Sequence, residues 1–341
     1  MKYITKLVSN TVSSTTEQRN QLKILTEALT SPVTSNIMRT PLQATFMSIL
    51  VKSGGKPSQD KYSLFHDYYN AILKREKQKN VLKIISEHED YISDIHYRLG
   101  HQLQLSSQRE NNSSAHINIS DFKVLVEKYF EEQELEKETI ETYTTEIMEA
   151  ITLRLVFITE NQDNKIGFAI RSTQEYFSAM LNVHNLQDKI VINNIQNIAT
   201  SIYWRNVFLF MLGYVAKNKE YLLDNLDSYI GELNGSGLEY NELSSSSITK
   251  YGSLISLEIL AESILSSKPK NENKFIKHIN KLNYVPLSEN NFNLLKKLNN
   301  KKINHILLKM LIDGVSTEQY EIKMNSWVMV SELVEIDIDS F

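Results

Sequence analysis

Apolar residues recur at intervals of three and four along most of the chain. Such spacing places side chains on one face of an α-helix, so we expect amphipathic helices that bury this face. In the first half of the chain the pattern covers residues 17–29, 40–51, 58–73, 80–105, 120–130 and 139–153. In the second half it covers residues 187–200, 203–217, 219–231, 247–266, 271–282, 288–299, 301–313 and 317–334. The chain is therefore predicted to be mainly α-helical.

One stretch predicts β-structure. Residues 155–159 and 166–170 are largely apolar and β-branched, and they flank a polar turn at 160–165, as expected for a β-hairpin. A helix is predicted to follow at once, with Ser172 as its N-cap and Glu175 completing a capping box. Amphipathic helices that lead into a hairpin and a further helix are typical of a winged-helix domain.

The clearest helix start in the chain lies at Thr40. Pro41 suits the first helical position, and Gln43 is spaced to complete a capping box with Thr40. A glycine turn at 52–57 ends this helix, and Ser58 is expected to open the next one. The polar segment 108–117 is predicted to be a loop, and the acidic run 131–138 a solvated connection between helices.

These elements predict three regions. They are a helical domain at 1–78, a winged-helix domain at 79–184 with its hairpin at 155–171, and a helical array at 185–341. Short helices that bury their apolar faces on neighbours favour an irregular α-solenoid-like arrangement for the array. The fold class expected is mainly α, a helical bundle plus a winged-helix domain with one β-hairpin, followed by this array. Apolar and polar residues alternate in part of the tail at 327–341, so helix and strand both stay open there.

Composition narrows the class of protein. The chain has 341 residues, of which 41% are hydrophobic and 23% charged, as is ordinary for a soluble globular protein. It contains no cysteine, which excludes disulfides, thiolate zinc sites and cysteine nucleophiles. Its apolar runs fall far short of a membrane-spanning length, so a cytoplasmic protein without membrane contact is predicted. The net charge of −4 gives no general attraction to nucleic acid.

Two segments resemble the NACHT-type signal-transduction ATPases, a group of STAND NTPases. RTPLQATFMSILVKSGGKPSQDKYSLFHDYY (39–69) resembles the helical-domain stretch in which an N-P-L-L-like start precedes a helix, a glycine turn and a tyrosine-bearing helix. IGFAIRSTQEYFSAM (166–180) is similar to the signature F-x-H-x-S-F-Q-E-Y-F-x-A that closes the family's winged-helix domain. The likeness covers about residues 20–215 in order and spacing.

The resemblance implies two nucleotide-contact positions. The family's proline packs on the adenine, and the matching residue is Pro41, with Thr40 in place of asparagine. The family's winged-helix histidine touches the β-phosphate, and the matching residue is Ile170, which cannot donate a hydrogen bond. This phosphate contact is therefore either missing or supplied by a neighbour such as Arg171, whose guanidinium can pair with phosphate oxygens. Gln174, Glu175 and Tyr176 also match the signature, and we interpret them as capping and core residues.

The chain lacks the catalytic parts of such ATPases. No G-x-x-x-x-G-K-[ST] occurs, because the nearest string, at 53–56, has Leu50 where the first glycine belongs and Pro57 after the lysine. No magnesium-binding acidic strand precedes Pro41 either. The chain thus resembles the back half of such an ATPase. We expect no hydrolysis and no cofactor on this chain alone, and ATP or ADP with Mg²⁺ only together with a P-loop ATPase module.

Other site chemistries find less support. His88, His96 and His101 lack the H-E-x-x-H spacing and are interpreted as surface histidines rather than metal ligands. No G-x-S-x-G nucleophile elbow occurs. The lysines at 296, 297, 301 and 302 are interpreted as a solvated helix face.

Three functions stay open. The preferred one is a regulatory and sensor segment of a NACHT-like switch, which in the family signals invasion, in bacteria often by phage, and oligomerises on activation. Its partner would be a P-loop ATPase module or another protein. The first alternative is a stand-alone helical scaffold that binds protein. The second is a winged-helix DNA-binding protein. Glu141, Glu146 and Glu149 on the expected recognition helix argue against it, since these carboxylates would repel phosphates.

Overall fold

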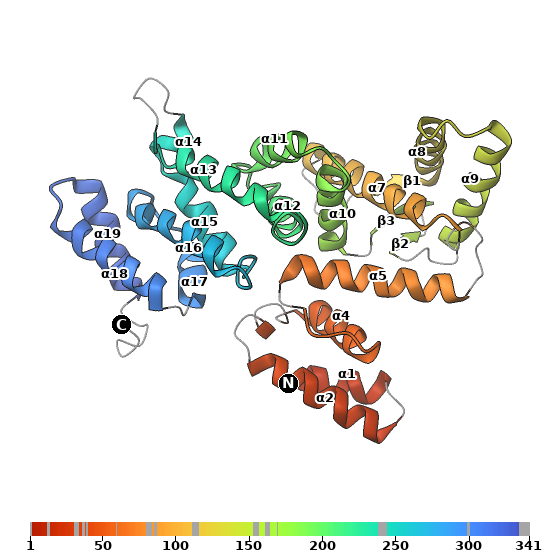
Figure 1. Ribbon diagram of the computed structural model, residues 1–341, viewed down its shortest axis with the longest axis horizontal. Helices are drawn as coiled ribbons and strands as arrows, with labels where there is room; N and C mark the ends of the chain where they lie inside the picture. Colours follow the sequence, from red (N-terminus) through yellow and green to blue (C-terminus); the bar gives the residue numbers. More distant parts are fainter. Residues whose placement is uncertain are drawn as a thin grey trace. The chain divides into compact units, whose positions relative to one another are not determined.

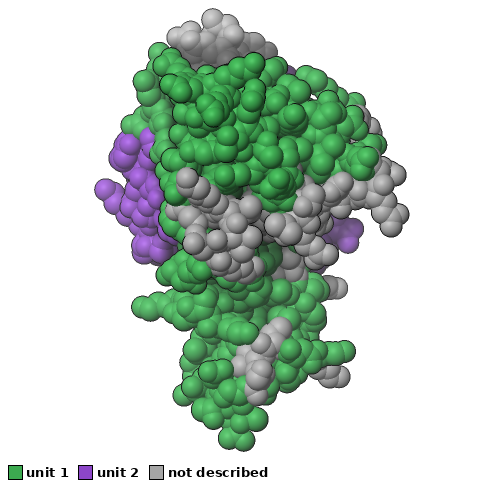
Figure 2. Space-filling view, turned by 90° about the vertical axis from the view of Figure 1, so that its right-hand side faces the viewer, with its two compact units in different colours: residues 1–191, 202–211 green, residues 192–201, 212–341 purple. Residues whose placement is uncertain are grey.

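The computed structural model divides the chain into two compact units (Figure 2). Unit 1 comprises residues 1–191 and 202–211, and unit 2 comprises residues 192–201 and 212–341. The structure describes residues 2–11, 14–30, 34–35, 38, 40–58, 60–79, 84, 87–110, 116–152, 157–160, 164–168, 170–237, 244–298 and 301–333. Within these residues every helix is too short or too polar to cross a lipid bilayer.

The first unit is mostly helical and contains a small sheet (Figure 1). Its elements are α1 (Lys2–Thr11), α2 (Thr15–Thr30), α4 (Pro41–Lys52), α5 (Lys61–Lys79), α7 (Glu89–Glu110), β1 (Ile117–Asn118), α8 (Ile119–Glu132), α9 (Lys137–Thr152), β2 (Ile158–Glu160), β3 (Lys165–Phe168) and α10 (Arg171–Val183). The two helices that follow, α11 (Asp188–Ile198) and α12 (Arg205–Asn218), each contribute residues to both units. The mainly helical prediction is confirmed.

The predicted apolar stripes form the core of unit 1. All five residues of the α5 stripe are buried, namely Tyr62, Phe65, Tyr69, Ile72 and Leu73. All four of the α7 stripe are fully buried, namely Ile92, Ile95, Leu99 and Leu103. Helices α7 and α10 pack closely against each other. This pair is the core against which the sheet and α5 pack.

The small sheet has the strand order β1-β3-β2, with both pairs antiparallel. The predicted hairpin is present as β2 and β3, in which Ile158 pairs with Phe168. Glu160 and Lys165, predicted to lie in the turn, belong to the strands because they continue the register. Residues 155–156, 161–163 and 169 of the predicted hairpin region lie outside the described residues.

Part of the predicted polar loop at 108–117 is ordered structure. Helix α7 continues to Glu110, and β1 begins at Ile117, whose backbone pairs with Ile166 on β3. The loop prediction is wrong at both ends. Ile117 is buried, so the strand forms because β3 offers a partner and the core offers a place for its one apolar side chain.

Two helix starts differ from the prediction and one agrees. Helix α10 begins at Arg171, and its N-cap is Ile170, so Ser172 is not the cap. The amides of Thr173 and Gln174 donate to the Ile170 carbonyl. The helix predicted to open at Ser58 begins at Lys61 instead, with the Asp60 carboxylate accepting from the Ser63 amide at 2.8 Å. The capping box at Thr40 is confirmed in full.

The second unit consists of short helices. They are η1 (Glu220–Leu222), α13 (Leu223–Leu233), α14 (Ser245–Ile248), α15 (Tyr251–Ala261), α16 (Pro269–His278), η3 (Ile279–Tyr284), α17 (Glu289–Lys297), α18 (Lys301–Ser316) and α19 (Tyr320–Leu333). Helix α15 contacts α13, α16, α17 and η3, and α18 packs on α19 and η3. The buried core of the unit lies along these contacts.

In this unit the structure corrects one prediction and decides another that was left open. The single helix predicted over 247–266 is interrupted, because Lys250 takes the left-handed conformation with φ of 53° between α14 and α15. Residues 327–333, left open between helix and strand, are helical in α19. The remainder of that tail, 334–341, lies outside the described residues.

Candidate functional site

Pro41 is exposed at the first position of α4. Its place is fixed by the capping box, in which the Thr40 hydroxyl accepts from the Gln43 amide at 3.2 Å. The Gln43 side-chain oxygen accepts in turn from the Thr40 amide, also at 3.2 Å. The pyrrolidine ring is therefore held at the surface on a rigid helix start, where it can pack against a planar ligand.

Arg171, the predicted phosphate partner, is engaged inside the chain. Its Nε donates to Glu175 Oε1 at 3.0 Å, one helical turn further along α10. Its guanidinium also lies 5.3 Å from the centre of the Tyr203 ring. The Glu175 side chain is only 4% exposed, whereas that of Arg171 is 37% exposed. The terminal guanidinium nitrogens make no hydrogen bond within the described residues, so they can still reach a ligand.

Ile170 immediately precedes Arg171 and is the N-cap of α10. Its side chain is half-buried and offers no hydrogen bond to the helix start. Pro41 and Arg171 lie near the beginnings of two different helices, and no hydrogen bond, ion pair or ring contact among the described residues joins them. The structure therefore places the predicted contact residues at helix starts without bringing them into direct contact.

The matched signature residues Gln174 and Tyr176 are core residues of α10. Gln174 donates to the side chain of Gln104 on α7 at 2.9 Å. The Tyr176 hydroxyl lies 3.2 Å from His66 Nδ1 on α5. Burial raises the pKa of Tyr176 well above its usual value, so this hydroxyl stays protonated. The interpretation of these residues as core is confirmed, whereas the capping interpretation is wrong.

The histidines set aside in the sequence differ in their surroundings. His96 is fully buried, with Nδ1 2.6 Å from the carbonyl of Ile92, so its interpretation as a surface residue is wrong. His88 and His101 are half-buried. Burial lowers the pKa of His101. No group of three or more metal-ligating side chains occurs in the part of the chain that the structure describes.

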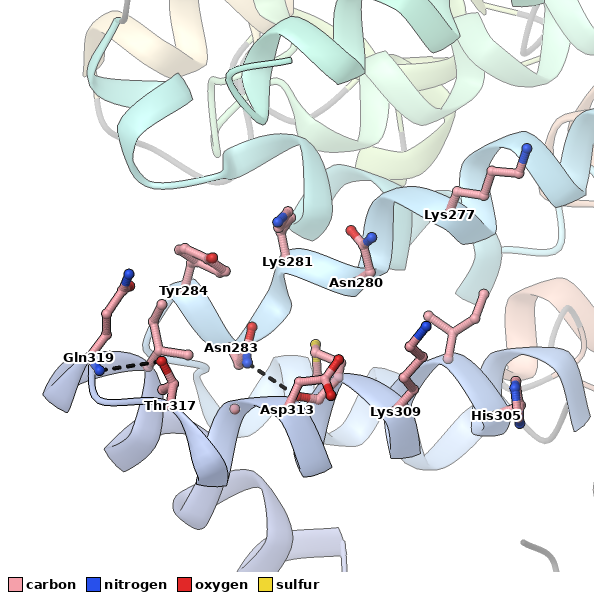
Figure 3. Close-up of a pocket in the computed structure, with 14 residues that line it drawn as sticks. Lys277, Asn280, Lys281, Asn283, Tyr284, His305, Lys309, Asp313, Thr317 and Gln319 are labelled. Atoms are coloured by element: carbon pink, nitrogen blue, oxygen red, sulfur yellow. Dashed lines mark hydrogen bonds between the residues drawn. The ribbon is translucent and has the colours of Figure 1, made fainter. Parts of the chain in front are cut away.

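A pocket that the sequence did not indicate lies within unit 2 and has a volume of about 530 Å³. Figure 3 shows Lys277, Lys281 and Tyr284 along one wall and His305 and Lys309 along the other. The first wall comes from the end of α16 and from η3, and the second from α18. The basic residues are spaced four apart on each wall, but sequence spacing alone could not bring the two walls together.

The comparisons with known proteins add no relative. No protein family model, no curated protein and no solved structure matches this chain. What the chain does is therefore inferred from its residues and their geometry.

Proposed function

We propose that this chain is the regulatory and sensor segment of a NACHT-like signal-transduction ATPase, of the kind used in antiviral defence. Unit 1 would close over a nucleotide held by a separate P-loop module, and the helices of unit 2 would bind a protein partner. Nucleotide and the protein partner would then shift the equilibrium between two packings of the winged-helix elements. Hydrolysis would depend on the P-loop module.

The strand order is the observation that carries this proposal. The elements run α7, β1, α8, α9, β2, β3, with β1 paired on β3. A short strand between the first two helices that pairs with the last strand of a terminal hairpin is the topology of winged-helix domains. Because the resemblance drew on 166–180 and took no account of β1, this pairing supports the proposal independently.

The packing of α10 suggests which contacts would rearrange in such a switch. Two residues separate helix α10 from the last strand, and Phe177 of the helix packs on Phe168 of the strand with ring centres 5.1 Å apart. On its other side, Tyr176 contacts Phe65 and His66 of α5. In this proposal, α5 belongs to the helical domain and α10 to the winged-helix domain. Their aromatic contact would be the hinge surface between the two packings.

The decisive experiment reconstitutes the full chain with the P-loop ATPase encoded beside it. We expect a complex that retains ADP through desalting, and Ile170→His should increase the retained fraction because an imidazole can donate to phosphate. Ile190→His makes the same change at an exposed site on α11 and should leave retention unaltered. The proposal would be refuted if no P-loop ATPase were encoded beside this chain, or if the complex never retained nucleotide.

A stand-alone protein-binding scaffold is the second candidate, and exposed apolar side chains on α18 and α19 favour it. The exposed fractions are 57% for Ile312, 74% for Tyr320 and 54% for Trp327. Large exposed apolar groups are common where proteins bind each other. If this function is right, adding ATP or ADP with Mg²⁺ should not change the melting temperature of any complex that the chain forms, since nothing in it would bind nucleotide.

DNA binding is the least supported of the three. In a winged-helix DNA-binding protein, α9 would be the recognition helix, and its exposed residues include Glu138, Glu141 and Glu149. Carboxylates on that face would repel the phosphates of a duplex. Of the separate lysine cluster, Lys302 donates to Asn273 at 3.1 Å and Lys296 lies 4.0 Å from Glu332, so both also interact within the chain.

A further inference from the structure

Asn283 lies at the base of the unit 2 pocket with its side-chain orientation fixed. It is 3% exposed, and its amide nitrogen donates to the Met310 carbonyl at 3.4 Å and to Ser326 Oγ at 3.2 Å. The Ser326 hydroxyl donates its own proton to the Ile322 carbonyl at 2.7 Å. Both partners of the Asn283 nitrogen therefore act as acceptors, which excludes the flipped amide.

The side-chain carbonyl oxygen of Asn283, Oδ1, consequently faces away from these acceptors and has no donor among the described residues. A buried acceptor without a partner is destabilising, and native proteins rarely keep one without a reason. Asn283 lines the pocket. A ligand that brings an N–H or O–H group to the base of the pocket would satisfy this oxygen once the side chains that cover it, which leave it less than 1 Å² of accessible surface, move aside.

Close packing of α18 on η3 and α19 creates this base. A β-carbon at Gly314 would lie 2.0 Å from Ser326 Oγ and 2.5 Å from Asn283 Nδ2. Only glycine lets the helices approach this closely. The position of Asn283 is thus built into the fold and does not depend on a flexible loop.

The walls of the pocket carry excess positive charge. Lys277, Lys281 and Lys309 form no ion pair within 4.0 Å among the described residues, and Asp313 is the single carboxylate in the lining. Lys250 lies close by, 6.0 Å from the Tyr284 ring, and burial together with the charge of Lys281 lowers its pKa. The three lysines outnumber the one carboxylate, so this concave site keeps a net positive charge and favours an anion.

We propose that this pocket binds a phosphorylated small molecule of sugar-phosphate or nucleotide size. The lysines of the two walls hold the phosphate, and a hydroxyl or amino group of the ligand donates to Asn283 Oδ1. The pocket volume of about 530 Å³ suits such a molecule. This site uses residues of unit 2 alone and does not rest on the proposed nucleotide switch.

Isothermal titration calorimetry of the full chain at low ionic strength tests the site with three probes. Ribose 5-phosphate carries both the anion and hydroxyl donors, methyl phosphate carries the anion, and ribose carries the donors. We expect ribose 5-phosphate to bind about tenfold more tightly than methyl phosphate, since one more hydrogen bond to a buried group is made. Ribose should not bind measurably.

Matched lysine variants locate the binding. Lys281→Gln and Lys309→Gln should each weaken ribose 5-phosphate about tenfold by removing a charge-assisted contact. Lys323→Gln removes the same charge from an exposed position of α19 outside the pocket lining and should leave the affinity unchanged. All three positions lie at or near the surface, so folding should survive, and circular dichroism checks this.

Three results would overturn the proposal. They are no heat of binding with ribose 5-phosphate, an equal loss of affinity in Lys323→Gln, or equal affinity for ribose 5-phosphate and methyl phosphate. The last result would remove the role of Asn283. None of them bears on nucleotide retention with a P-loop module, so the two proposals fail separately.

Discussion

Gly100 on α7 lies against Phe177 on α10 with no space for a β-carbon between them. An alanine Cβ at position 100 would lie 2.6 Å from Phe177 Cβ and 3.0 Å from the Gln174 carbonyl oxygen. We expect Gly100→Ala to destabilise the protein by about 1–3 kcal/mol, because overpacking should outweigh the better helix propensity of alanine. Urea denaturation followed by circular dichroism measures the change.

Gly231 on α13 provides the matched control. A β-carbon there would meet nothing closer than His278 Cε1 at 3.6 Å, which is an ordinary contact. Gly231→Ala should therefore be neutral or stabilise by up to about 1 kcal/mol, since alanine restricts the unfolded chain. Equal losses in the two variants would contradict the close approach of α7 and α10.

The Arg171–Glu175 pair supplies a second prediction. Glu175 is nearly buried, so Arg171→Ala leaves its carboxylate without its cation and should cost about 1–3 kcal/mol. Adding Glu175→Gln to this variant should recover part of the loss, because a neutral amide is cheaper to bury. Chemical denaturation of the single and double variants gives the coupling free energy. A coupling near zero would show that the pair contributes nothing.

An exposed pair on α9 serves as the reference for this cycle. Lys137 and Glu141 are also spaced four residues apart, but their side chains are 92% and 70% exposed and their charged atoms lie 4.0 Å apart. Solvent screens such a pair, so Lys137→Ala should change stability little. The contrast separates the effect of burial from the effect of helical spacing.

Local capping rules identified one helix start correctly and failed at another. At Thr40 every participant lies within three residues, so the sequence contained the whole motif. Ser172 and Glu175 offered the same spacing, yet α10 starts at Arg171. Thr173 and Glu175 are buried in this register, and Glu175 pairs with Arg171. Tertiary packing decided between two starts that local rules could not distinguish.

Features that depend on distant partners could not be predicted. The two residues of β1 lie in a polar segment and become a strand only because β3 is beside them. Asn283 is similar, since its partners Met310 and Ser326 are 27 and 43 residues away. The apolar stripes were predictable because helical periodicity is local, whereas the pocket arises from how the helices pack.

The Thr40 capping box gives a third prediction. Thr40→Ala removes the hydroxyl that accepts from the Gln43 amide and should destabilise α4 by about 1 kcal/mol. Thr40→Ser keeps the oxygen and should cost much less. Thermal unfolding compares the two variants with wild type. If serine and alanine prove equally destabilising, the methyl group of Thr40 matters and the cap does not.

His101 on α7 supplies a prediction about pH. Its Nδ1 lies 3.2 Å from Ser178 Oγ and 3.3 Å from Asn182 Nδ2, both on α10. Burial lowers the pKa of His101 below its ordinary value of 6.5. The fold therefore favours the neutral imidazole, and protonation would place a charge in a partly buried site beside the Asn182 amide.

The sign of the effect follows from this lowered pKa. As pH falls, the unfolded chain binds a proton at His101 before the folded chain does, because folding lowers the pKa of this group. The stability that neutral His101 contributes is therefore present above pH 6.5 and is lost as pH falls from there through the folded-state pKa. Wild type should thus lose more unfolding free energy than His101→Gln when pH falls from about 7.5 to about 5.5. His116→Gln, at an exposed histidine of the same unit, should follow the wild-type profile. Urea denaturation at a series of pH values makes the comparison, and parallel profiles for wild type and His101→Gln would show that His101 is not the group that titrates.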